Sequence, residues 1–136
     1  MDKLLKLEIT SPDRIMYSGD VKYVIAPAKQ GEIQVLFNHA DLVSILGTGR
    51  VVIEQENGHV VKYAASGGII EVKKNTVSIL AEEIEKWDEI DVDASKEKVD
   101  RALAALKTSG TDKEALLTLI ELEKNKINVA KHCCPK

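Results

Sequence analysis

The residues whose types and spacing come closest to chemistry are His39 and Asp41, at the end of the stretch 31–42, which reads GEIQVLFNHADL. A histidine that is oriented by a carboxylate can serve as a general base, provided that a nucleophile lies within its reach. This stretch contains no serine or cysteine. We therefore favour a histidine that stabilises a corner or contacts a partner, and we keep a small hydrolase that uses His39 and Asp41 as an alternative.

Two other patterns could hold a metal or a phosphate, but the spacing of each argues against it. Cys133 and Cys134 are adjacent, whereas zinc-binding pairs usually have two or more residues between them, and a disulfide between neighbours would be strained. The stretch Ser66-Gly67-Gly68 lacks the pattern and the strand-to-helix context of a phosphate loop. We predict free thiols, a glycine pair that permits a bulge or a close backbone approach, and no catalytic residue, metal or cofactor.

The composition limits the class of protein. The 136 residues fit one medium domain or a small domain with an appendage, and a content of 44% hydrophobic residues can build a core. A net charge of −3 argues against general binding of nucleic acid. No apolar run approaches the ~20 residues of a membrane span, and the N-terminus lacks a signal-peptide core. We expect a cytoplasmic protein that contacts membranes through partners.

Residues 1–86 show the pattern of short strands. Leu5, Leu7 and Ile9 alternate with polar residues, as in a strand with one buried face. Asn57-Gly58 predicts a tight hairpin, since both residues tolerate positive φ. About nine or ten strands are expected, over 5–10, 14–17, 21–26, 31–37, 42–46, 50–55, 59–64, 69–73 and 76–81. We predict a β-sandwich or flattened barrel, in which the close spacing leaves no room for the crossovers of a parallel sheet.

The pattern changes after residue 81. Residues 82–89 are polar and acidic, which indicates a linker, and Trp87 is expected to pack between the two parts that the linker joins. We therefore divide the chain into a β-sandwich domain, residues 1–86, and a helical domain, residues 87–136.

Residues from Val92 onward show the apolar spacing of two helices. Asp91 or Asp93 can cap the first helix, and Gly110 suits its end. Residues 111–114, reading TDKE, form a capping box that opens the second helix. The apolar faces are predicted to contain Val99, Ala102, Leu103 and Leu106, and then Leu116, Leu119, Ile120, Ile127 and Ala130. A loop of about four residues makes the two helices an antiparallel hairpin.

Basic residues dominate the end of the second helix, at Lys124, Lys126 and Lys131. The helix dipole stabilises lysines at this position by ~0.3–1 kcal/mol, which is a sufficient structural explanation. The alternative is a basic arm that docks on an acidic surface. The residues alone leave both interpretations open.

Several separated blocks of sequence carry a family resemblance. The first block contains Gly31-Glu32-Ile33, Val35-Leu36, His39-Ala40 and Leu42, and the second contains 67–72 (GGIIEV) and 77–82 (VSILAE). In this order they resemble the epsilon subunit of bacterial rotary (F-type) ATP synthases. The resemblance runs from about Leu5 to Ala105, and the family's helical tail follows it.

The resemblance implies a non-catalytic subunit of the central stalk, which is part of the rotor. Such a subunit links the gamma subunit to the membrane c-ring, couples ion flow to ATP synthesis and restrains ATP hydrolysis through its C-terminal helices. It would lie at the cytoplasmic face of the bacterial cell membrane as a peripheral protein, and it would work with protons or sodium ions. The competing hypothesis is a free-standing β-sandwich module that binds another protein and has a helical appendage.

The resemblance also implies site residues. Glu32 and His39 would face the gamma subunit and the c-ring, whereas Lys124, Lys126 and Lys131 would meet an acidic segment of the catalytic subunits.

Some family members bind ATP on the helical hairpin with an I-D-x-x-R-A motif, and this chain departs from it. Residues 90–95 read IDVDAS, so that Asp91 is kept and Ala94 stands at the arginine position. Arg101 and Glu85 match a second basic residue and an upstream acid of that site. Loss of the guanidinium removes a charge-assisted contact of ~1.5–3 kcal/mol. We expect weak ATP binding or none.

Overall fold

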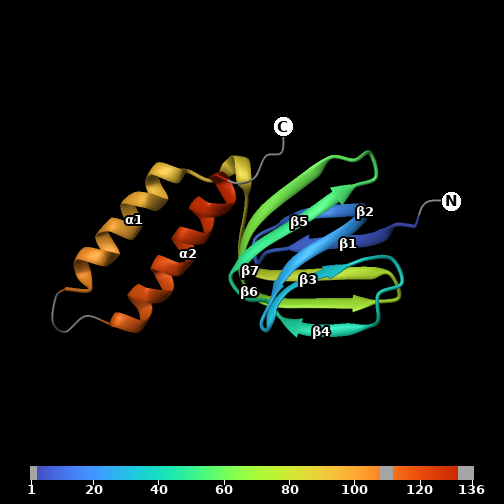
Figure 1. The fold of residues 1–136 in the computed structure, drawn as a ribbon, viewed down its shortest axis with the longest axis horizontal. Helices are drawn as coiled ribbons and strands as arrows, with labels where there is room; N and C mark the ends of the chain where they lie inside the picture. The colour runs from blue at the N-terminus through green and yellow to red at the C-terminus, as the bar shows by residue number, and fades with distance from the viewer. Residues whose placement is uncertain (1–2, 108–111, 132–136) are drawn as a thin grey trace.

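The computed structural model describes residues 3–107 and 112–131, which form a body of strands followed by a pair of helices (Figure 1). The helices pack side by side in antiparallel directions, and α2 lies between α1 and the strands. The elements in chain order are β1 (Leu5–Thr10), β2 (Ile15–Ala28), β3 (Gly31–Val35), β4 (Leu42–Ile45), β5 (Gly49–Gln55), β6 (Val60–Lys73), β7 (Thr76–Lys86), the 3₁₀ turn η1 (Trp87–Glu89), α1 (Val92–Ala105) and α2 (Lys113–Lys131). The prediction of a mainly β fold with a two-helix appendage is confirmed.

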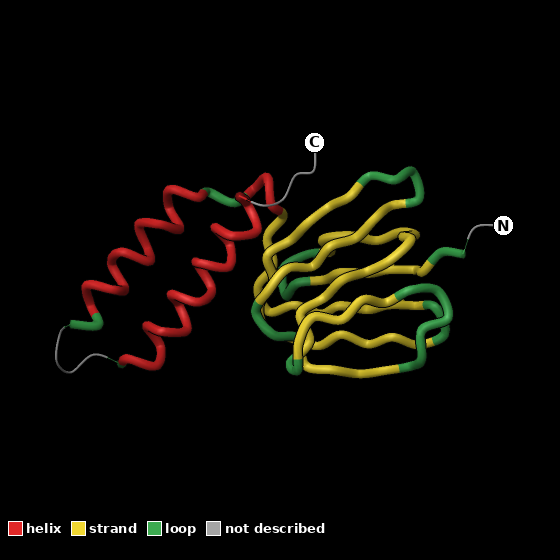
Figure 2. The backbone as a smooth tube through the Cα atoms, viewed as in Figure 1, coloured by secondary structure: helices red, strands yellow, loops and turns green. Residues whose placement is uncertain are grey.

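The sheet closes on itself. Its strands follow the order β1-β7-β6-β5-β2-β3, and β1 also pairs with β2, so that β1, β7, β6, β5 and β2 form a ring. β3 extends the ring beside β2, and β4 extends it beside β6. Flattened, this ring is a sandwich of two layers (Figure 2). One pair in the ring, β1 with β7, is parallel. We expected no parallel pair, but here the five strands between them make the crossover.

Two strands are longer than the sequence indicated. Ser18 and Gly19 continue β2, where they pair with Glu8 and Leu7 of β1. Gly67 and Gly68 likewise lie inside β6, with positive φ values of 74° and 117°. A Cβ atom on Gly68 would lie 1.8 Å from the carbonyl oxygen of Leu80, so that this glycine allows β6 to approach β7 closely. The described residues therefore form seven strands, some of them long, where we expected about nine or ten short ones.

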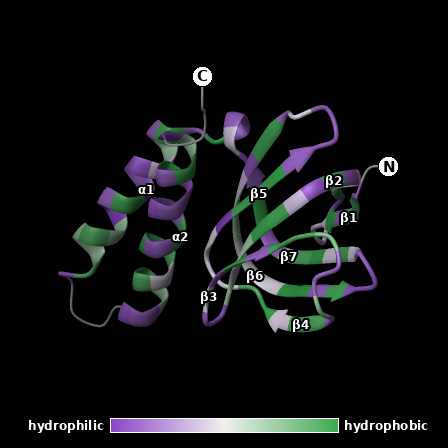
Figure 3. Ribbon diagram, turned by 45° about the vertical axis from the view of Figure 1, so that its right-hand side comes forward, coloured by the Kyte–Doolittle hydropathy of each residue, from purple (hydrophilic) through white to green (hydrophobic). Residues whose placement is uncertain are grey.

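The core is aliphatic, as the scarcity of aromatic residues requires. Leu5, Leu7 and Ile9 are buried along β1 while the residues between them are exposed, which confirms the predicted alternation. Figure 3 shows the same alternation of hydrophobic and hydrophilic residues along other strands. Each aliphatic side chain that is fully buried contributes about 1.5–3 kcal/mol to folding. The sandwich core contains Leu5, Leu7, Ile9, Val21, Val24, Ala26, Val35, Leu46, Val51, Ile53, Val61, Tyr63, Ala65, Ile70, Val72, Val77, Ile79 and Ala81.

The predicted linker is shorter than expected. Residues 82–86 complete β7 instead, and Lys86 pairs with Tyr63 of β6. What remains between the sandwich and the helices is η1 with Ile90 and Asp91. Trp87 is half-buried in η1, and this turn contacts both β6 and α2. Its position agrees with the predicted role of packing between the two parts.

The helices begin at aspartate caps. The Oδ1 atom of Asp91 accepts a hydrogen bond from the Ala94 amide at 3.1 Å, which confirms one of the two predicted caps of α1. The Oδ1 atom of Asp112 accepts one from the Ala115 amide at 3.1 Å at the start of α2. The proposed helix end at Gly110 and the Thr111 of the proposed capping box lie outside the described residues.

The two helices share a small apolar core. Val99, Ala102 and Ile120 are its buried members, and Leu106, Leu116 and Ile127 pack against them. Leu103 and Leu119, which we placed on the apolar faces, are 43% and 36% exposed. Helical spacing alone assigned too wide an apolar face, because two helices that pack on each other cover a narrow strip of each.

Candidate partner-binding surfaces

The sandwich has a row of large apolar side chains on its surface, outside the core. Ile45 of β4 pairs with Ile69 of β6, which pairs with Leu80 of β7, and these three side chains are 55%, 48% and 57% exposed. Val43, two residues before Ile45 on the same face of β4, is 68% exposed. We call these four residues the β4–β6–β7 face. Contiguous apolar surface of this kind typically marks a protein contact.

A groove runs along this face. It has a volume of about 550 Å³, and its lining includes Ile45, Ile69, Leu80 and the glycine pair Gly67-Gly68. Because the glycines lack side chains, backbone forms part of the lining of the groove. We did not predict this surface from the sequence. The available signal was two consecutive apolar residues within one strand, as in Leu42-Val43 and Ile69-Ile70, because consecutive residues point to opposite faces of a sheet. A sandwich strand with one face in solvent needs apolar residues only on its other face.

Glu32, a predicted site residue, is bound to a side chain of β5, across the intervening strand β2. Its Oε2 and Oε1 atoms accept hydrogen bonds from Nε and Nη2 of Arg50 at 2.8 and 3.1 Å, a bidentate pair between β3 and β5. The bonds from Arg50 lower the pKa of Glu32, and they raise the pKa of Arg50 in turn. Both side chains are nearly half exposed. They line a cleft of about 450 Å³ that Asn125 and Val129 of α2 also line.

His39, the second predicted site residue, holds a corner of the backbone. Its amide donates to the carbonyl of Leu36 at 3.0 Å, and its Nδ1 lies 2.7 Å from the carbonyl oxygen of Ala40, so that Nδ1 carries the proton. The Oδ1 atom of Asp41 accepts a bond from the Lys74 amide at 3.2 Å instead of meeting the histidine. A general-base pair would need the carboxylate on the imidazole. The hydrolase alternative has no support in this geometry.

Glu32 and His39 do not form one patch. Glu32 is the second residue of β3, and His39 follows the other end of that strand. The structure therefore places Glu32 beside α2 and places His39 at the corner that leads into β4.

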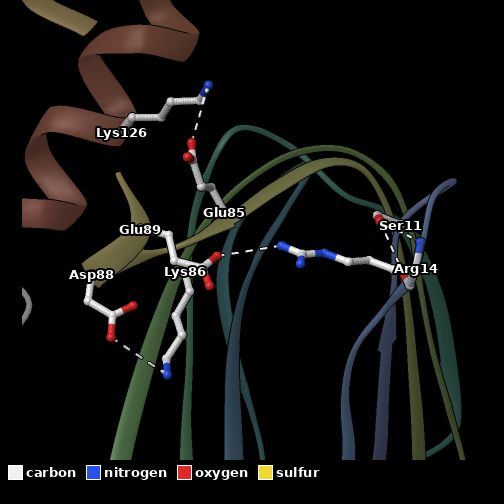
Figure 4. A network of polar contacts seen from close by, with 7 residues as sticks. All are labelled: Ser11, Arg14, Glu85, Lys86, Asp88, Glu89 and Lys126. Atoms are coloured by element: carbon white, nitrogen blue, oxygen red, sulfur yellow. Dashed lines mark hydrogen bonds and ion pairs between the residues drawn. The ribbon is translucent and has the colours of Figure 1, made fainter. Parts of the chain in front are cut away.

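The helix α2 docks on the sandwich through polar contacts. The Nδ2 atom of Asn125 donates to the carbonyl oxygen of Gly49 at 2.8 Å. The Nζ atom of Lys126 lies 3.6 Å from Oε1 of Glu85 on β7 and 3.4 Å from Oε2 of Glu123 on its own helix. Figure 4 shows the Lys126 side chain extending from α2 to the carboxylate of Glu85. Nearby pairs of Arg14 with Glu89 and of Lys86 with Asp88 occupy the same edge (Figure 4).

The three lysines proposed as a basic arm are not equivalent. Lys124 and Lys131 are exposed, whereas the Lys126 side chain is 16% exposed and faces two carboxylates of this chain. The spacing of the lysines did not reveal this difference, because it depends on which side of α2 meets the sandwich.

The residues matched to the ATP site of other family members do not converge. Glu85 is bound to Lys126, and the Asp91 carboxylate caps α1. Arg101 is exposed further along α1, about 15 Å from Asp91 along the helix axis at 1.5 Å per residue. The cleft that Glu85 lines has neither Asp91 nor Arg101 in its lining.

Within residues 3–107 and 112–131, no group of histidine, cysteine, aspartate and glutamate side chains could hold a metal ion. In the same part of the chain, no helix has the length and apolar content to cross a membrane. His132, Cys133 and Cys134 lie outside the described residues.

Comparisons with known proteins give one consistent result. The family model described as ATP synthase, Delta/Epsilon chain, beta-sandwich domain matches residues 4–87. The ATP synthase epsilon chain of Desulforamulus reducens is 35% identical over 96% of this chain and 99% of its own length. That of Brevibacillus brevis is 43% identical over 72% of this chain and 74% of its own.

Solved structures share the fold. A chain in the cryo-EM structure of the Euglena gracilis mitochondrial ATP synthase, OSCP/F1/c-ring in rotational state 1, superposes with a TM-score of 0.78 at 25% identity, over 96% of this chain and 82% of that chain. A chain from the central stalk and c-ring of the Tetrahymena thermophila mitochondrial enzyme shares the fold, with a TM-score of 0.56 at 15% identity. This protein belongs to the family of ATP synthase epsilon chains, which are non-catalytic subunits of that complex.

Proposed function

We propose that this chain is a rotor subunit that joins the gamma subunit of an ATP synthase to the membrane c-ring, couples ion flow to ATP synthesis, and restrains ATP hydrolysis through α1 and α2. The solved relatives come from an F1/c-ring assembly and from a central stalk with its c-ring. The observation that carries the proposal is the exposed β4–β6–β7 face on a closed sandwich. A subunit that transmits torque needs a surface that binds its partner tightly, on a domain that does not deform.

The closed ring supplies the stiff body. Hydrogen-bonded ladders join all its strands, and the aliphatic core fills the space between the layers. Packed interiors have low compressibility, so that a force applied at one face reaches the other. A sandwich with free edges in the ring would shear more easily.

Separate surfaces suit a subunit with two rotor partners. We assign the β4–β6–β7 face and the adjoining His39 corner to the gamma subunit, because large apolar side chains dominate the buried centres of stable interfaces. We assign the end of the sandwich that carries Glu32 to the c-ring. The membrane contact of this chain is then made through its partners, at the cytoplasmic face of a bacterial membrane.

The helix pair is the regulatory part. Its contacts with the sandwich include a hydrogen bond from Asn125 and an ion pair of Lys126, polar contacts that water can replace when α2 moves away. The exposed Lys124 and Lys131 would meet acidic groups of the catalytic subunits when α2 leaves the sandwich. A helix pair held there would hinder rotation in the direction of hydrolysis.

The decisive experiment places a charge in the apolar face. Ile69→Asp should leave the sandwich folded, because this side chain is half exposed, and should weaken binding of the gamma subunit by more than about thirtyfold, as the loss of a central contact does. Titration calorimetry with purified gamma subunit measures the affinity, and circular dichroism checks the fold. The matched control is Leu103→Asp on α1, a similarly exposed apolar residue outside the face. Equal affinities for Ile69→Asp and the unchanged chain would refute the assignment.

The alternative of a free-standing binding module makes a different prediction. The chain would then be recovered from membranes with a partner unrelated to ATP synthase. Capture with the full chain as bait, followed by identification of the gamma subunit in the eluate, separates the two functions.

A further inference from the structure

The edge of the sandwich next to α2 is strongly acidic. A cleft of about 410 Å³ lies between the loop that follows β1 and the end of β7, and its lining includes Asp13, Glu82, Glu83 and Glu85. Two basic residues also line it, Arg14 and Lys126. Arg14 comes from the sandwich and pairs with Glu89 at 3.5 Å, whereas Lys126 enters from the helix pair (Figure 4). Lys126 is thus the basic group that docking adds to this cleft.

Lys126 also lies beside a buried carboxylate of its own helix. Glu123 is 2% exposed, and its Oε1 atom has no hydrogen-bond partner among the described residues. Its Oε2 atom lies 3.4 Å from Nζ of Lys126. A buried carboxylate needs a partner that offsets its charge, and removal of Lys126 would leave Glu123 without this cation. The same ammonium therefore serves Glu85 on the sandwich and Glu123 on the helix.

We propose that Glu85, Lys126 and Glu123 form an ionic latch that holds α2 on the sandwich, and that the acidic edge of the sandwich competes, within one chain, with any acidic partner for Lys126. The second half of this statement rests on the proposed regulatory function of the helix pair. The first half concerns the isolated chain. The latch is reversible, because Glu85 is partly exposed and water can replace its contact with Lys126.

The latch separates the roles of the lysines on α2. The charge of Lys126 acts on the docked position, where it has two acidic partners. Lys124 is exposed on the same helix and lies outside the cleft lining. Loss of charge at 126 should therefore release α2, whereas loss of charge at 124 should not. High salt should weaken the docked position, since Glu85 is partly exposed.

The test measures docking in the full chain. Nitroxide labels are placed at Asn57→Cys, in the turn between β5 and β6, and at Lys113→Cys, at the start of α2, with Cys133 and Cys134 changed to serine. Pulsed dipolar spectroscopy then gives the ratio of docked to released molecules, at a urea concentration at which the parent shows both. We expect Lys126→Met to lower this ratio about tenfold, because the carboxylates of Glu85 and Glu123 would then lie close together in the docked position without a cation between them. Glu85→Gln should lower it about two- to fourfold, as a partly exposed pair does.

Lys124→Met is the matched control, with the same loss of charge on the same helix, and its ratio should stay within about 1.5-fold of the parent. The double variant Glu85→Gln/Lys126→Met should release α2 no more than Lys126→Met alone, because the two side chains act as one contact. Equal ratios for the two lysine variants would overturn the latch. So would fully additive effects of Glu85→Gln and Lys126→Met.

A separate measurement keeps the latch distinct from the regulatory function. ATP hydrolysis is compared in complexes assembled with the parent chain and with Lys126→Met. Release of α2 in the isolated chain, with hydrolysis unchanged, would support the latch and count against the helix pair as a brake.

Discussion

The sandwich and the helix pair hold themselves together in different ways. The sandwich has a ring of paired strands around one large aliphatic cluster. The helix pair has, among the described residues, a core of Val99, Ala102 and Ile120 with three flanking side chains, and it meets the sandwich through Asn125 and Lys126. The first arrangement resists deformation, whereas the second can be undone by competition for a few polar groups. A rigid part and a releasable part can thus share one short chain.

The largest effect is expected where the ring is tightest. Gly68→Ala should lower the free energy of unfolding by at least about 3 kcal/mol, because its Cβ would lie 1.8 Å from the Leu80 carbonyl oxygen and its φ is 117°. Urea denaturation measures this. Gly58→Ala is the control: its φ is also positive, at 89°, but no atom lies within 4 Å of the added Cβ, and the expected loss is about 1 kcal/mol. Similar losses at both positions would mean that the close contact of β6 with β7 adds no rigidity.

The second prediction concerns ligand binding by the helix pair. Titration of the full chain with ATP should give a dissociation constant in the millimolar range or no signal, since Ala94 supplies no charge and Glu85 is held by Lys126. Ala94→Arg should tighten binding about tenfold, or ~1.4 kcal/mol. Ala94→Gln is a control for size without charge. Micromolar affinity in the unchanged chain would show that other residues replace the missing arginine.

The third prediction separates the two parts. A chain that ends after Lys86 should fold as a sandwich, with a loss of about 1 kcal/mol, because the sandwich keeps its own core and polar contacts such as those of Asn125 and Lys126 contribute little each. It should still bind the gamma subunit, and the assembled complex should hydrolyse ATP about threefold faster. Lys124→Ala with Lys131→Ala should give part of that rise. If the shortened chain does not assemble, the helices belong to the rotor joint.

The smallest effect is expected at the surface pair of Glu32 and Arg50. Arg50 holds the pKa of Glu32 below its usual value, so the pair stabilises the fold above the unfolded pKa of that carboxyl, and the contribution is lost as the pH falls through the folded pKa. Glu32→Gln should therefore cost about 0.2–1 kcal/mol at pH 7, because both groups are nearly half exposed, and progressively less as the pH falls through the folded pKa. Melting curves from pH 7 into the acid range test this, with the exposed Glu8→Gln as control. A penalty that persists at low pH would point to packing instead of charge.

The same Glu32→Gln variant has a functional readout. Attachment of the chain to the c-ring should weaken while the fold persists. Unchanged attachment would remove Glu32 from the proposed rotor contacts and leave it a structural residue of the sandwich.

Local sequence patterns predicted the strands and helices better than they predicted which strands pair with one another. The alternation in β1 and the Asp91 cap could be predicted because burial of one strand face and the start of a helix each produce a sequence pattern within a few residues. The glycines at 19, 67 and 68 were wrongly placed between strands, because the same residue type marks a turn and a close backbone approach, although the predicted close approach of the Gly67-Gly68 pair is confirmed at Gly68. The parallel pairing of β1 with β7 joins strands at opposite ends of the sandwich sequence, and local periodicity carries no signal of it.

The candidate sites divide in the same way. The family resemblance pointed to Glu32 and His39, but the apolar face needs β4 to pair with β6 across the intervening β5 in sequence, and its exposure follows from that topology. Lys126 looked like its neighbours until the docking of α2 placed it between two carboxylates. Glu123 gave no sign of burial, since a charged residue is ordinarily assigned to the solvent side of a helix.

The parallel pair of β1 and β7 has a consequence for synthesis of the chain. Residues 6–10 find their partners at 76–80, so the first strand made must wait for the last strand of the sandwich before the ring can close. Such distant pairings are slow to form, and until then β1 presents a free edge to other nascent chains. The helices emerge after β7 and take no part in this closure. The sandwich can therefore close as soon as β7 has left the ribosome, before the helices form.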